Sequence, residues 1–490
     1  MDKPKSFCGI FGIWGNENAS LITYYGLHAL QHRGQEATGI LVRKINGNNK
    51  IVFNIVKGEG LVSEVYSDDS LWSNILLGTA AIGHNRYSTT GASGSRKNIQ
   101  PFVVNYRDGN LAVAHNGNLT NAAQIRNNLI HEGAIFQTTS DTEIILHLIA
   151  RSQLDNQVEQ ILDSLNKIEG AFCLTILTDN ALIAARDPYG FRPLALGKKD
   201  GCFVVASETC AFDINLVEYI RDVEPGEVIV IDDEVNKTGI IKSYFLNEKI
   251  KEKKYCIFEY IYFSRPDSKI FGHNVDKVRR RLGKILAKNH PVVDKDGEKV
   301  IVISVPDSSN TAAIGYQNEL EKLNIKSKLE IGLIRSHYIG RTFIQPHQQK
   351  REIGVRIKFN TVKGVIEGKT VVLIDDSIVR GTTSKLLVNL IKEANPKEIH
   401  LRISSPPILY PCFYGMDFPS SEELIAFKMK NNIEQIREYL GVDSVEYMST
   451  EELLEAVYEE DKNNFCTACF SGNYPTLVDT SFKKEMYENK

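Results

Sequence analysis

The sequence lacks the features that would assign it to a membrane, to nucleic acid or to the P-loop nucleotide hydrolases. No apolar run approaches the roughly 18 residues that a membrane-spanning helix needs. The formal net charge is -3, so no excess of basic residues favours nucleic acid as a partner. A Walker A sequence is absent. Residues 1–7 contain no apolar core and are not a secretory signal, so we expect a cytoplasmic protein.

The composition is that of a globular protein with more than one domain. Hydrophobic residues make up 42% and charged residues 24% of the 490 residues. A chain of this length is too long for one ordinary core, so we expect two or three domains. The eight cysteines do not indicate a disulfide framework, because that pattern belongs to short secreted chains.

A cysteine near the start of the chain precedes a short apolar stretch, CGIFGIWG, at residues 8–15. The stretch alone favours a buried structural cysteine that opens a strand. The alternative is a nucleophile. If residues 1–7 were removed, Cys8 would carry a thiol and a free α-amine, and an amine that titrates at about pH 8 can accept the thiol proton.

Two arginines follow in polar, glycine-punctuated segments. HRGQEATGI contains Arg33 and is either a solvated turn or part of a polar site. GTAAIGHNRYSTTG contains Arg86, whose guanidinium can bind a carboxylate through two hydrogen bonds. A lone arginine is more often a surface residue, and the sequence leaves both interpretations open.

The next two candidate positions also have adequate structural explanations. Asn116-Gly117 in LAVAHNGNLT is typical of a hairpin turn, although it can also present an amide and a backbone N–H to an oxyanion. Ser140 and Glu143 predict a capping box at the start of a helix. Asp141 in that first turn is favoured by the helix dipole, and a role in binding an ammonium group would be additional.

The pattern changes after a charged linker at residues 247–254. The first 240 or so residues are strand-rich and indicate an α+β unit. Near-continuous apolar strands then follow at residues 299–306, 369–376 and 398–407, with helical segments between them. Buried strands that alternate with helices predict an α/β, doubly wound parallel sheet, whose ligands bind beyond the carboxyl ends of the strands.

Two strand ends in this second unit carry groups suited to phosphate and metal. VVLIDDSIVRGTTS ends a strand in Asp375 and Asp376, which suit Mg²⁺ or ribose hydroxyls. Glycine and hydroxyl residues before a helix favour phosphate binding through backbone N–H groups. The residues of this loop are Ser377, Arg380, Gly381, Thr382 and Thr383. A second strand-to-helix loop carries Asp307, Ser308, Ser309 and Thr311.

A cationic stretch at residues 335–360 lies between these two loops. It contains six lysines and arginines: Arg335, Arg341, Lys350, Arg351, Arg356 and Lys358. It could be a solvated loop or a nucleic-acid patch. Its place beside two phosphate-binding loops favours a lid over a polyphosphorylated substrate.

The C-terminal FCTACF contributes Cys466 and Cys469 in a CxxC pair, which is half of a metal site. Cys256 and Cys412 are the plausible completing ligands because neither lies inside an apolar strand. Four thiolates suit structural Zn²⁺ and a [4Fe–4S] cluster equally well, and the spacing does not choose between them.

Taken together, these stretches resemble the amidophosphoribosyltransferase family, the glutamine phosphoribosylpyrophosphate amidotransferases, over nearly the whole chain. The N-terminal motifs are shared with all N-terminal-nucleophile glutamine amidotransferases, and the Asp375 loop with phosphoribosyltransferases; this family joins them in this order. The motifs that carry the resemblance are CGIFGIWG, HRGQEATGI, GHNRYSTTG, AHNGNL, SDTE, EYIYFSRPDS, VPDSSNTAAIGY, GRTFIQP, VVLIDDSIVRGTT and CTACF.

The resemblance implies a glutamine site in the first half of the chain. Cys8 would be the nucleophile, Arg86 and Asp141 would hold the carboxylate and ammonium of glutamine, and Asn116 and Gly117 would form the oxyanion hole. Ammonia would then pass inside the closed protein to the second site. There it would displace pyrophosphate from 5-phosphoribosyl 1-pyrophosphate to give 5-phosphoribosylamine, the committed step of purine synthesis.

The resemblance also assigns the second site and its cofactors. Asp375 and Asp376 would bind the ribose hydroxyls and Mg²⁺, with Ser308 near the metal, and residues 377–383 would cradle the 5-phosphate. The branch of the family with a propeptide has a [4Fe–4S] cluster, which matches the four cysteines, so the resemblance favours the cluster over zinc.

The implied fold is an αββα sandwich of the N-terminal-nucleophile class followed by a phosphoribosyltransferase-type sheet. The expected boundaries are a propeptide at 1–7, an amidotransferase domain at 8–246, a phosphoribosyltransferase domain at 255–460 and a segment with two cluster ligands at 461–490. A homotetramer inhibited by purine nucleotides is also expected. One departure is the lid, which begins Arg335-Ser336-His337 where the family pattern has a lysine first and an arginine third.

Two rival hypotheses each leave one of the two candidate sites without a function. An amidotransferase that aminates another acceptor, such as a sugar phosphate, would not need the Asp375 loop. A nucleotide-sensing regulator on a phosphoribosyltransferase fold would have no use for Cys8 and its partners.

Overall fold

The fold is described from a computed structural model. The structure describes residues 8–87, 96–246, 252–336, 355–416, 418, 420–457 and 459–478. The predicted propeptide, most of the predicted lid and the last twelve residues lie outside the described residues. In the described part of the chain, no helix is long and apolar enough to cross a membrane.

The first half of the chain forms two sheets in which every paired strand is antiparallel to its neighbour. The seven-stranded sheet, in the order β11-β9-β10-β1-β4-β2-β3, comprises β1 (Gly9–Trp14), β2 (Ala37–Ile45), β3 (Ile51–Glu59), β4 (Ala80–Arg86), β9 (Ala195–Lys199), β10 (Cys202–Ala206) and β11 (Glu218–Asp222). The six-stranded sheet, in the order β13-β12-β8-β7-β6-β5, comprises β5 (Phe102–Tyr106), β6 (Gly109–Leu119), β7 (Gly170–Thr178), β8 (Leu182–Arg186), β12 (Glu227–Ile231) and β13 (Lys242–Phe245).

These two sheets are the inner layers of a four-layer sandwich. Alternate residues of a strand face opposite sides of its sheet, and in β1 Ile10 packs toward the other sheet whereas Phe11 packs toward the helices. The helices on the seven-stranded sheet are α1 (Ala19–Ala29), α2 (Val62–Val65) and α6 (Cys210–Asp213). Those on the six-stranded sheet are α3 (Ala122–His131), α4 (Thr142–Arg151) and α5 (Gln157–Leu165). The expected αββα sandwich is therefore confirmed.

The second half is built on a five-stranded parallel sheet in the order β18-β17-β21-β22-β23. Its strands are β17 (Val300–Ser304), β18 (Ser327–Leu329), β21 (Thr370–Asp375), β22 (Glu398–Ile403) and β23 (Ser444–Tyr447). Three of these strands match the predicted apolar runs, and helices cover both faces of the sheet. β17 and β21 are almost entirely buried, whereas Glu398 and His400 of β22 are half-buried.

The helices lie on the two faces of this sheet, as a doubly wound fold requires. One face packs against α8 (Val275–Asn289), α9 (Asn310–Lys322) and α15 (Thr450–Ala456). The other packs against α11 (Lys363–Ile366), α12 (Thr382–Lys392), α13 (Ile425–Lys428) and α14 (Ile433–Leu440). The α/β prediction for this half is confirmed.

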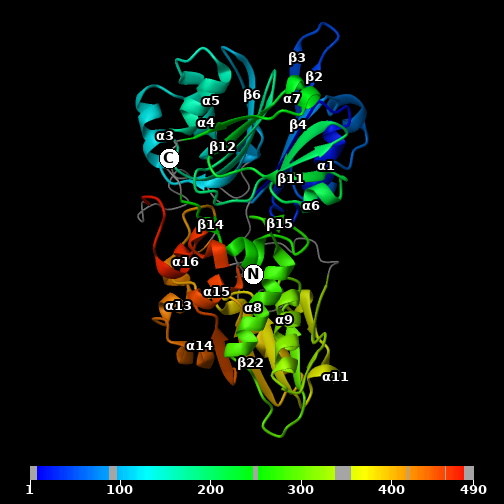
Figure 1. The fold of residues 1–490 in the computed structure, drawn as a ribbon, viewed down its shortest axis with the longest axis vertical. Helices are drawn as coiled ribbons and strands as arrows, with labels where there is room; N and C mark the ends of the chain where they lie inside the picture. The colour runs from blue at the N-terminus through cyan, green and yellow to red at the C-terminus, as the bar shows by residue number, and fades with distance from the viewer. Residues whose placement is uncertain are drawn as a thin grey trace.

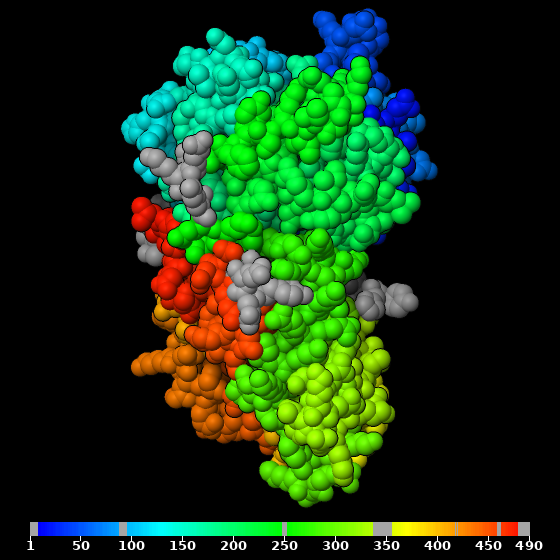
Figure 2. All heavy atoms as spheres, viewed as in Figure 1, coloured from blue at the N-terminus to red at the C-terminus, as the bar shows by residue number. Residues whose placement is uncertain are grey.

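The two halves stack end to end, with short elements at the junction (Figures 1 and 2). These elements are β14 (Tyr255–Cys256), η3 (Glu259–Phe263), β15 (Lys269–Ile270), β16 (His273–Asn274), β24 (Phe465–Cys466) and α16 (Ala468–Ser471). β14 and β24 pair in parallel, so the C-terminal segment returns to the start of the second half. The described elements that remain are α7 (Asp233–Thr238), the β19–β20 pair (Leu333–Arg335 and Phe359–Thr361) and four short helices, η1 (Leu71–Ile75), η2 (Arg96–Asn98), η4 (Ser421–Glu423) and η5 (Glu459–Asn464).

Candidate active sites

Cys8 lies immediately before β1, in a register that pairs Gly9 with Asn85 of β4. Its thiol is buried and directed at the carbonyl oxygen of Tyr87, with 3.5 Å between Sγ and O. Burial raises the pKa of this thiol to about 11, although the Tyr87 contact and the charge of Arg86 act in the opposite direction. At pH 7 a thiol with this pKa is ionised in only about one molecule in 10⁴. The thiol of the intact chain therefore needs a base before it can act as a nucleophile.

Arg86 and Asp141 converge on this thiol from different elements. Arg86 is the last residue of β4, and both residues are buried and act electrostatically on Cys8. Burial alone would raise the pKa of Asp141, but His115 and a bond from the Leu119 N–H (3.0 Å) hold it below its usual range. Asp141 is therefore an anion that faces β6. A favourable contact with the dipole of α4 would not by itself require this contact with β6.

The predicted capping box at this helix is wrong. α4 begins at Thr142, and Asp141 is its N-cap but makes no side-chain capping bond; its carboxylate accepts from the Thr142 hydroxyl instead (3.4 Å). The Glu143 carboxylate instead accepts the N–H groups of Gln137 (2.7 Å) and Thr138 (2.8 Å). Glu143 thus anchors the loop that precedes the helix.

Asn116 and Gly117 lie inside β6 and do not form a hairpin turn. They pair with Cys173 and Phe172 of β7, so the hairpin interpretation is wrong and the strand continues to Leu119. A Cβ atom on Gly117 would lie 1.9 Å from the carbonyl oxygen of Ala171, which only glycine avoids. The Asn116 side chain is fully buried next to the strand that follows Cys8.

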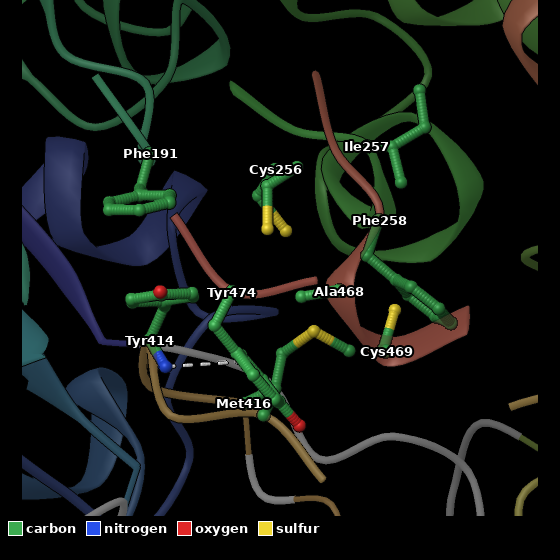
Figure 3. Close-up of a pocket in the computed structure, with 11 residues that line it drawn as sticks. Phe191, Cys256, Ile257, Phe258, Tyr414, Met416, Ala468, Cys469 and Tyr474 are labelled. Carbon is green, nitrogen blue, oxygen red and sulfur yellow. Dashed lines mark hydrogen bonds between the residues drawn. The ribbon is translucent and has the colours of Figure 1, made fainter. Parts of the chain in front are cut away.

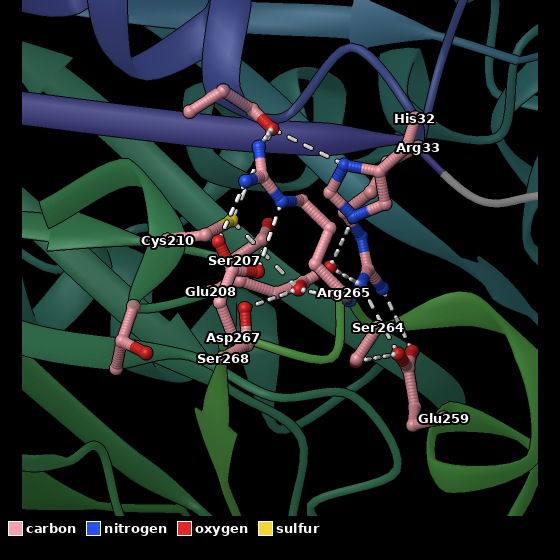
Figure 4. A network of polar contacts seen from close by, with 12 residues as sticks. His32, Arg33, Ser207, Glu208, Cys210, Glu259, Ser264, Arg265, Asp267 and Ser268 are labelled. Carbon is pink, nitrogen blue, oxygen red and sulfur yellow. Dashed lines mark hydrogen bonds and ion pairs between the residues drawn. The ribbon is translucent and has the colours of Figure 1, made fainter. Parts of the chain in front are cut away.

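Arg33 joins this site to the second half of the chain (Figure 4). Its side chain is fully buried; Nε donates to the carbonyl oxygen of Cys8 (3.3 Å), and Nη2 pairs with Glu259 of η3 (2.7 Å). Nη1 contacts the buried Glu208 carboxylate. Arg33 is therefore part of a polar site, and the solvated-turn interpretation is wrong.

Glu208 extends the same network toward the junction of the two halves. It accepts bonds from the Arg265 N–H (2.9 Å) and the Ser268 hydroxyl (2.7 Å), and His32 lies 2.7 Å from it. Burial would raise the pKa of Glu208, but His32 and Arg33 hold it well below the usual range. The carboxylate is therefore ionised at neutral pH in this interior.

Sequence reasoning missed Ser207 and Glu208. The available signal was the run of three polar residues, Ser207 to Thr209, directly after the apolar strand β10; polar residues at the end of an apolar strand also identified Asp375 and Asp376.

The second candidate site lies at the carboxyl end of β21. Asp375 and Asp376 are both buried there, and the Asp376 N–H donates to Asp375 Oδ1 (2.9 Å). Ser308 donates to Asp376 (2.5 Å) and Ser309 donates to Asp375 (3.3 Å), so the loop before α9 meets the loop after β21. The result is a compact set of carboxylate and hydroxyl oxygens.

The loop that follows leads into the N-terminus of α12. The Ser377 hydroxyl donates to Asp376 (2.7 Å). Gly381 adopts φ 77°, which favours glycine, and the helix's own bonding begins with the Lys385 N–H on the Gly381 carbonyl (2.9 Å). The N–H groups of Thr382 and Thr383 therefore point out of the helix end, where they can bind an anion.

Two described arginines near the second candidate site form ion pairs with carboxylates. Arg380 donates to Glu423 (2.6 Å), and Arg335 at the start of the predicted lid pairs with Asp307 (3.1 Å). His337, Arg341, Lys350 and Arg351 lie outside the described residues.

The four predicted cysteine ligands line one cavity (Figure 3). Cys256 and Cys466 are register partners in β14 and β24, Cys469 lies in α16, and Cys412 lies in the loop after β22. The other lining residues are aromatic or aliphatic, apart from the tyrosine hydroxyl groups: Phe191, Ile257, Phe258, Tyr414, Met416, Ala468 and Tyr474. Burial raises the pKa of all four thiols.

The cysteine cavity also touches the first half of the molecule. Phe191 stacks on Tyr414 with 4.1 Å between the ring centroids. Asn118, one residue beyond Gly117, donates to the carbonyl oxygen of Phe413 (2.9 Å), which follows Cys412. Within the described ranges, no three or more His, Cys, Asp or Glu side chains are placed to hold a metal ion.

The sequence and the fold are both similar to those of known proteins. Residues 84–213 match the glutamine amidotransferase domain family. The amidophosphoribosyltransferase of Bacillus subtilis is 48% identical over 475 residues, covering 96% of this chain and 94% of the Bacillus protein. The Methanocaldococcus jannaschii amidophosphoribosyltransferase is 44% identical, covering 96% of this chain and 98% of that protein.

Two solved structures match nearly the whole fold. One is an allosteric regulatory enzyme of purine biosynthesis, with a TM-score of 0.87, 46% identity and 97% coverage of both chains. The other is the glutamine phosphoribosylpyrophosphate amidotransferase of B. subtilis complexed with ADP and GMP. Its TM-score is 0.85 at 47% identity, covering 97% of this chain and 98% of that one.

Proposed function

The chain belongs to the amidophosphoribosyltransferase family, and we propose that it divides that family's reaction between the two sites described above. The reaction is the glutamine-dependent first step of purine biosynthesis. Water hydrolyses the glutamine amide to glutamate and ammonia, and the ammonia displaces pyrophosphate from 5-phosphoribosyl 1-pyrophosphate. One observation carries the proposal: the same chain holds a buried Cys8 thiol beside Arg86 and Asp141, and a separate oxygen-rich strand end at Asp375.

In the glutamine site, Cys8 is the nucleophile that attacks the side-chain amide carbon. The cationic Arg86 binds the α-carboxylate of glutamine, and the anionic Asp141 binds its α-ammonium group. The Asn116 side chain and the Gly117 N–H stabilise the oxygen that becomes negatively charged. The buried Asp141 anion and the deep position of Asn116 support these roles.

We propose that the bond between Phe7 and Cys8 is cleaved before the glutamine site becomes active. In the intact chain the Cys8 nitrogen is an amide and cannot accept a proton, and the thiol pKa of about 11 leaves almost no thiolate. A free α-amine supplies the missing base. Mass analysis of active protein should find Cys8 as the first residue, and fully glutamine-active protein that retains Met1 would contradict this step.

In the second site, the Asp375 and Asp376 carboxylates bind the ribose hydroxyls, and the Ser377–Thr383 loop binds the 5-phosphate at the end of α12. The carboxylate and hydroxyl set of Asp375, Asp376 and Ser308 fits Mg²⁺, which prefers oxygen ligands and would neutralise charge on the pyrophosphate. Ammonia released at Cys8 travels inside the protein to this site.

Cys8→Ala tests the division into two sites. The variant should lose glutamine-dependent pyrophosphate release by several orders of magnitude, because no other group can form the glutamyl thioester. Its ammonia-dependent pyrophosphate release should stay at the wild-type level, since the second site is untouched. Loss of both activities in a variant with a native circular dichroism spectrum would contradict separate sites.

We further propose that Cys256, Cys412, Cys466 and Cys469 hold a [4Fe–4S] cluster. An all-thiol donor set in an apolar cavity suits such a cluster, which would supply a structural cross-link between β14, β24 and the Cys412 loop. In a four-iron cluster each thiolate binds a different iron, so the thiols need not converge on one point as they would around zinc. Anaerobic protein should contain about four iron and four sulfide per chain, whereas zinc without sulfide would contradict the cluster.

We propose a homotetramer in the cytoplasm that is inhibited by purine nucleotides. The B. subtilis relative was solved with ADP and GMP, which supports nucleotide binding. Some plant relatives are chloroplastic, so compartment follows the organism. Light scattering should give four chains per particle, and added GMP and ADP should lower the rate at fixed substrate.

A further inference from the structure

One end of the Asn116 side-chain amide, the Oδ1 oxygen, lacks a hydrogen bond among the described residues. Its Nδ2 lies 3.4 Å from the hydroxyl oxygen of Ser207. Its Oδ1 is buried and has no hydrogen-bond partner among the described residues. A buried polar atom without a partner costs about 1–3 kcal/mol, so this orientation of the amide is unfavourable.

The surroundings of Ser207 show which orientation is favoured. Ser207 is fully buried after β10, and its Oγ already accepts the N–H of Ile10 (3.0 Å). The Ser207 N–H in turn donates to the Ile10 carbonyl (3.0 Å), so the serine is held against β1. Its hydroxyl proton therefore has to be donated elsewhere, and the Asn116 amide is the group within reach.

The two ends of a carboxamide have almost the same shape, so hydrogen bonds decide which end faces which neighbour. With Nδ2 toward Ser207, neither the serine proton nor Asn116 Oδ1 has a partner within the part of the chain that the structure describes. After a rotation of 180° about the last side-chain bond, the serine donates to Oδ1. The Nδ2 hydrogens then point where Oδ1 had been, which leaves them free to bind an oxyanion.

We propose that Ser207 is a positioning residue that presents the N–H end of Asn116 to the reacting glutamine. This inference rests on the proposed oxyanion role of Asn116. The neighbouring Glu208 is tied to Arg33, and Arg33 contacts the Cys8 carbonyl. The same short segment therefore fixes both the nucleophile's backbone and the oxyanion donor.

Ser207→Ala removes the orienting donor and keeps the small buried volume. The kcat for glutamate formation should fall about tenfold to hundredfold, because loss of an oxyanion donor costs about 10²–10³ in kcat and misorientation is a partial loss. The KM for glutamine and the ammonia-dependent rate should not change. Ser164→Ala, which removes a buried hydroxyl bonded to the Gln160 carbonyl in α5, is the matched control and should leave both rates unchanged.

A double-mutant cycle separates a positioning role from a general structural one. If Ser207 acts through Asn116, then Ser207→Ala should cause no further loss of kcat in an Asn116→Ala background. An equal loss in both backgrounds, or an unchanged kcat in the single variant, would overturn the inference. If Asn116→Ala retained the wild-type kcat, the proposed oxyanion role itself would fail, and the inference with it.

Ser207→Cys provides a second variant of similar size with a weaker donor. Its kcat should lie between those of the wild type and Ser207→Ala. Should Ser207→Ala fail to fold, as judged by loss of the ammonia-dependent rate, Ser207→Cys decides the question in the same cycle. A wild-type kcat for Ser207→Cys in that case would count against the inference.

Discussion

Glu259→Gln tests the ion-pair network that joins the two halves. Glu259 is fully buried in η3 and accepts hydrogen bonds from Arg33 Nη1 (3.0 Å) and Nη2 (2.7 Å) and from the Ser264 hydroxyl (2.6 Å). Arg192 Nη1 lies 3.4 Å away on the same carboxylate. Both arginines come from the first half, so the substitution removes the anion that two buried cations share across the junction.

The expected loss of stability follows from this geometry. Removing one partner of a buried ion pair costs about 3–5 kcal/mol, because the remaining charge is left uncompensated. Arg33 keeps Glu208, and Arg192 keeps its bond to the Tyr414 carbonyl. We therefore expect the lower end of this range, about 3 kcal/mol, which is a substantial part of the roughly 5–15 kcal/mol typical of native proteins.

Urea unfolding followed by tryptophan fluorescence measures the effect. The chain has two tryptophans, Trp14 and Trp72, and both lie in the first half. With a denaturant slope of about 3 kcal/mol per molar, the midpoint should fall by about 1 M. Far-UV circular dichroism of the same samples reports on both halves, and a separation of the two curves would show that they no longer unfold together.

Glu434→Gln is the matched control for this substitution. Glu434 pairs with Arg437 three residues along α14, and this pair is exposed, so its neutralisation should leave the midpoint unchanged. A Glu259→Gln protein that unfolds at the wild-type midpoint would refute the reasoning that this network couples the halves.

Two further predictions concern a buried histidine and a phosphate-loop glycine. Burial lowers the pKa of His84 from 6.5 to about 3, so its contribution to stability is present above about pH 6.5 and is lost as the pH falls toward 3. His84→Gln keeps a donor for the His115 carbonyl and should flatten the fall of the free energy of unfolding, measured by urea denaturation, between pH 6.5 and 4 by up to about 1.4 kcal/mol per pH unit; an unchanged slope would contradict this. Gly381→Ala would force an alanine to φ 77° with its Cβ 2.5 Å from Ile425 Cδ1, so the KM for phosphoribosyl pyrophosphate should rise roughly tenfold with ammonia as the nitrogen donor. Gly364→Ala, where no atom lies within 4 Å of the new Cβ, is the control, and an equal KM in both variants would count against the phosphate-loop role.

Most of the second site was predictable from local pattern. A buried parallel strand must be apolar, so the polar residues that follow it stand out. For this reason the sequence alone identifies Asp375 and the hydroxyl residues of the next loop as candidate ligands. The structure places β21 and α12 where that pattern predicts them.

The glutamine site was harder to predict because the strongest local preferences, for a hairpin turn and for a capping box, lost to other contacts. Asn116-Gly117 has strong turn propensity, but pairing with β7 over nine register partners keeps it in a strand. The Ser140–Glu143 capping box did not form, because the Glu143 carboxylate accepts two N–H groups of the preceding loop instead of the Ser140 N–H. At Asn116-Gly117 a tertiary contact outweighed a turn preference, whereas at Glu143 contacts with residues five and six positions away outweighed a capping preference worth about 1 kcal/mol.

The order of apolar strands, helices and polar strand ends was therefore encoded locally, since burial and backbone periodicity act over a few residues. The grouping of charged residues was not encoded locally, because the partners of Arg33 lie 175 residues away at Glu208 and 226 residues away at Glu259. Cys256 and Cys466 likewise meet only when β24 returns to β14. Such contacts depend on the tertiary fold, which brings distant segments together, and a local pattern of residues does not specify which distant segments will meet.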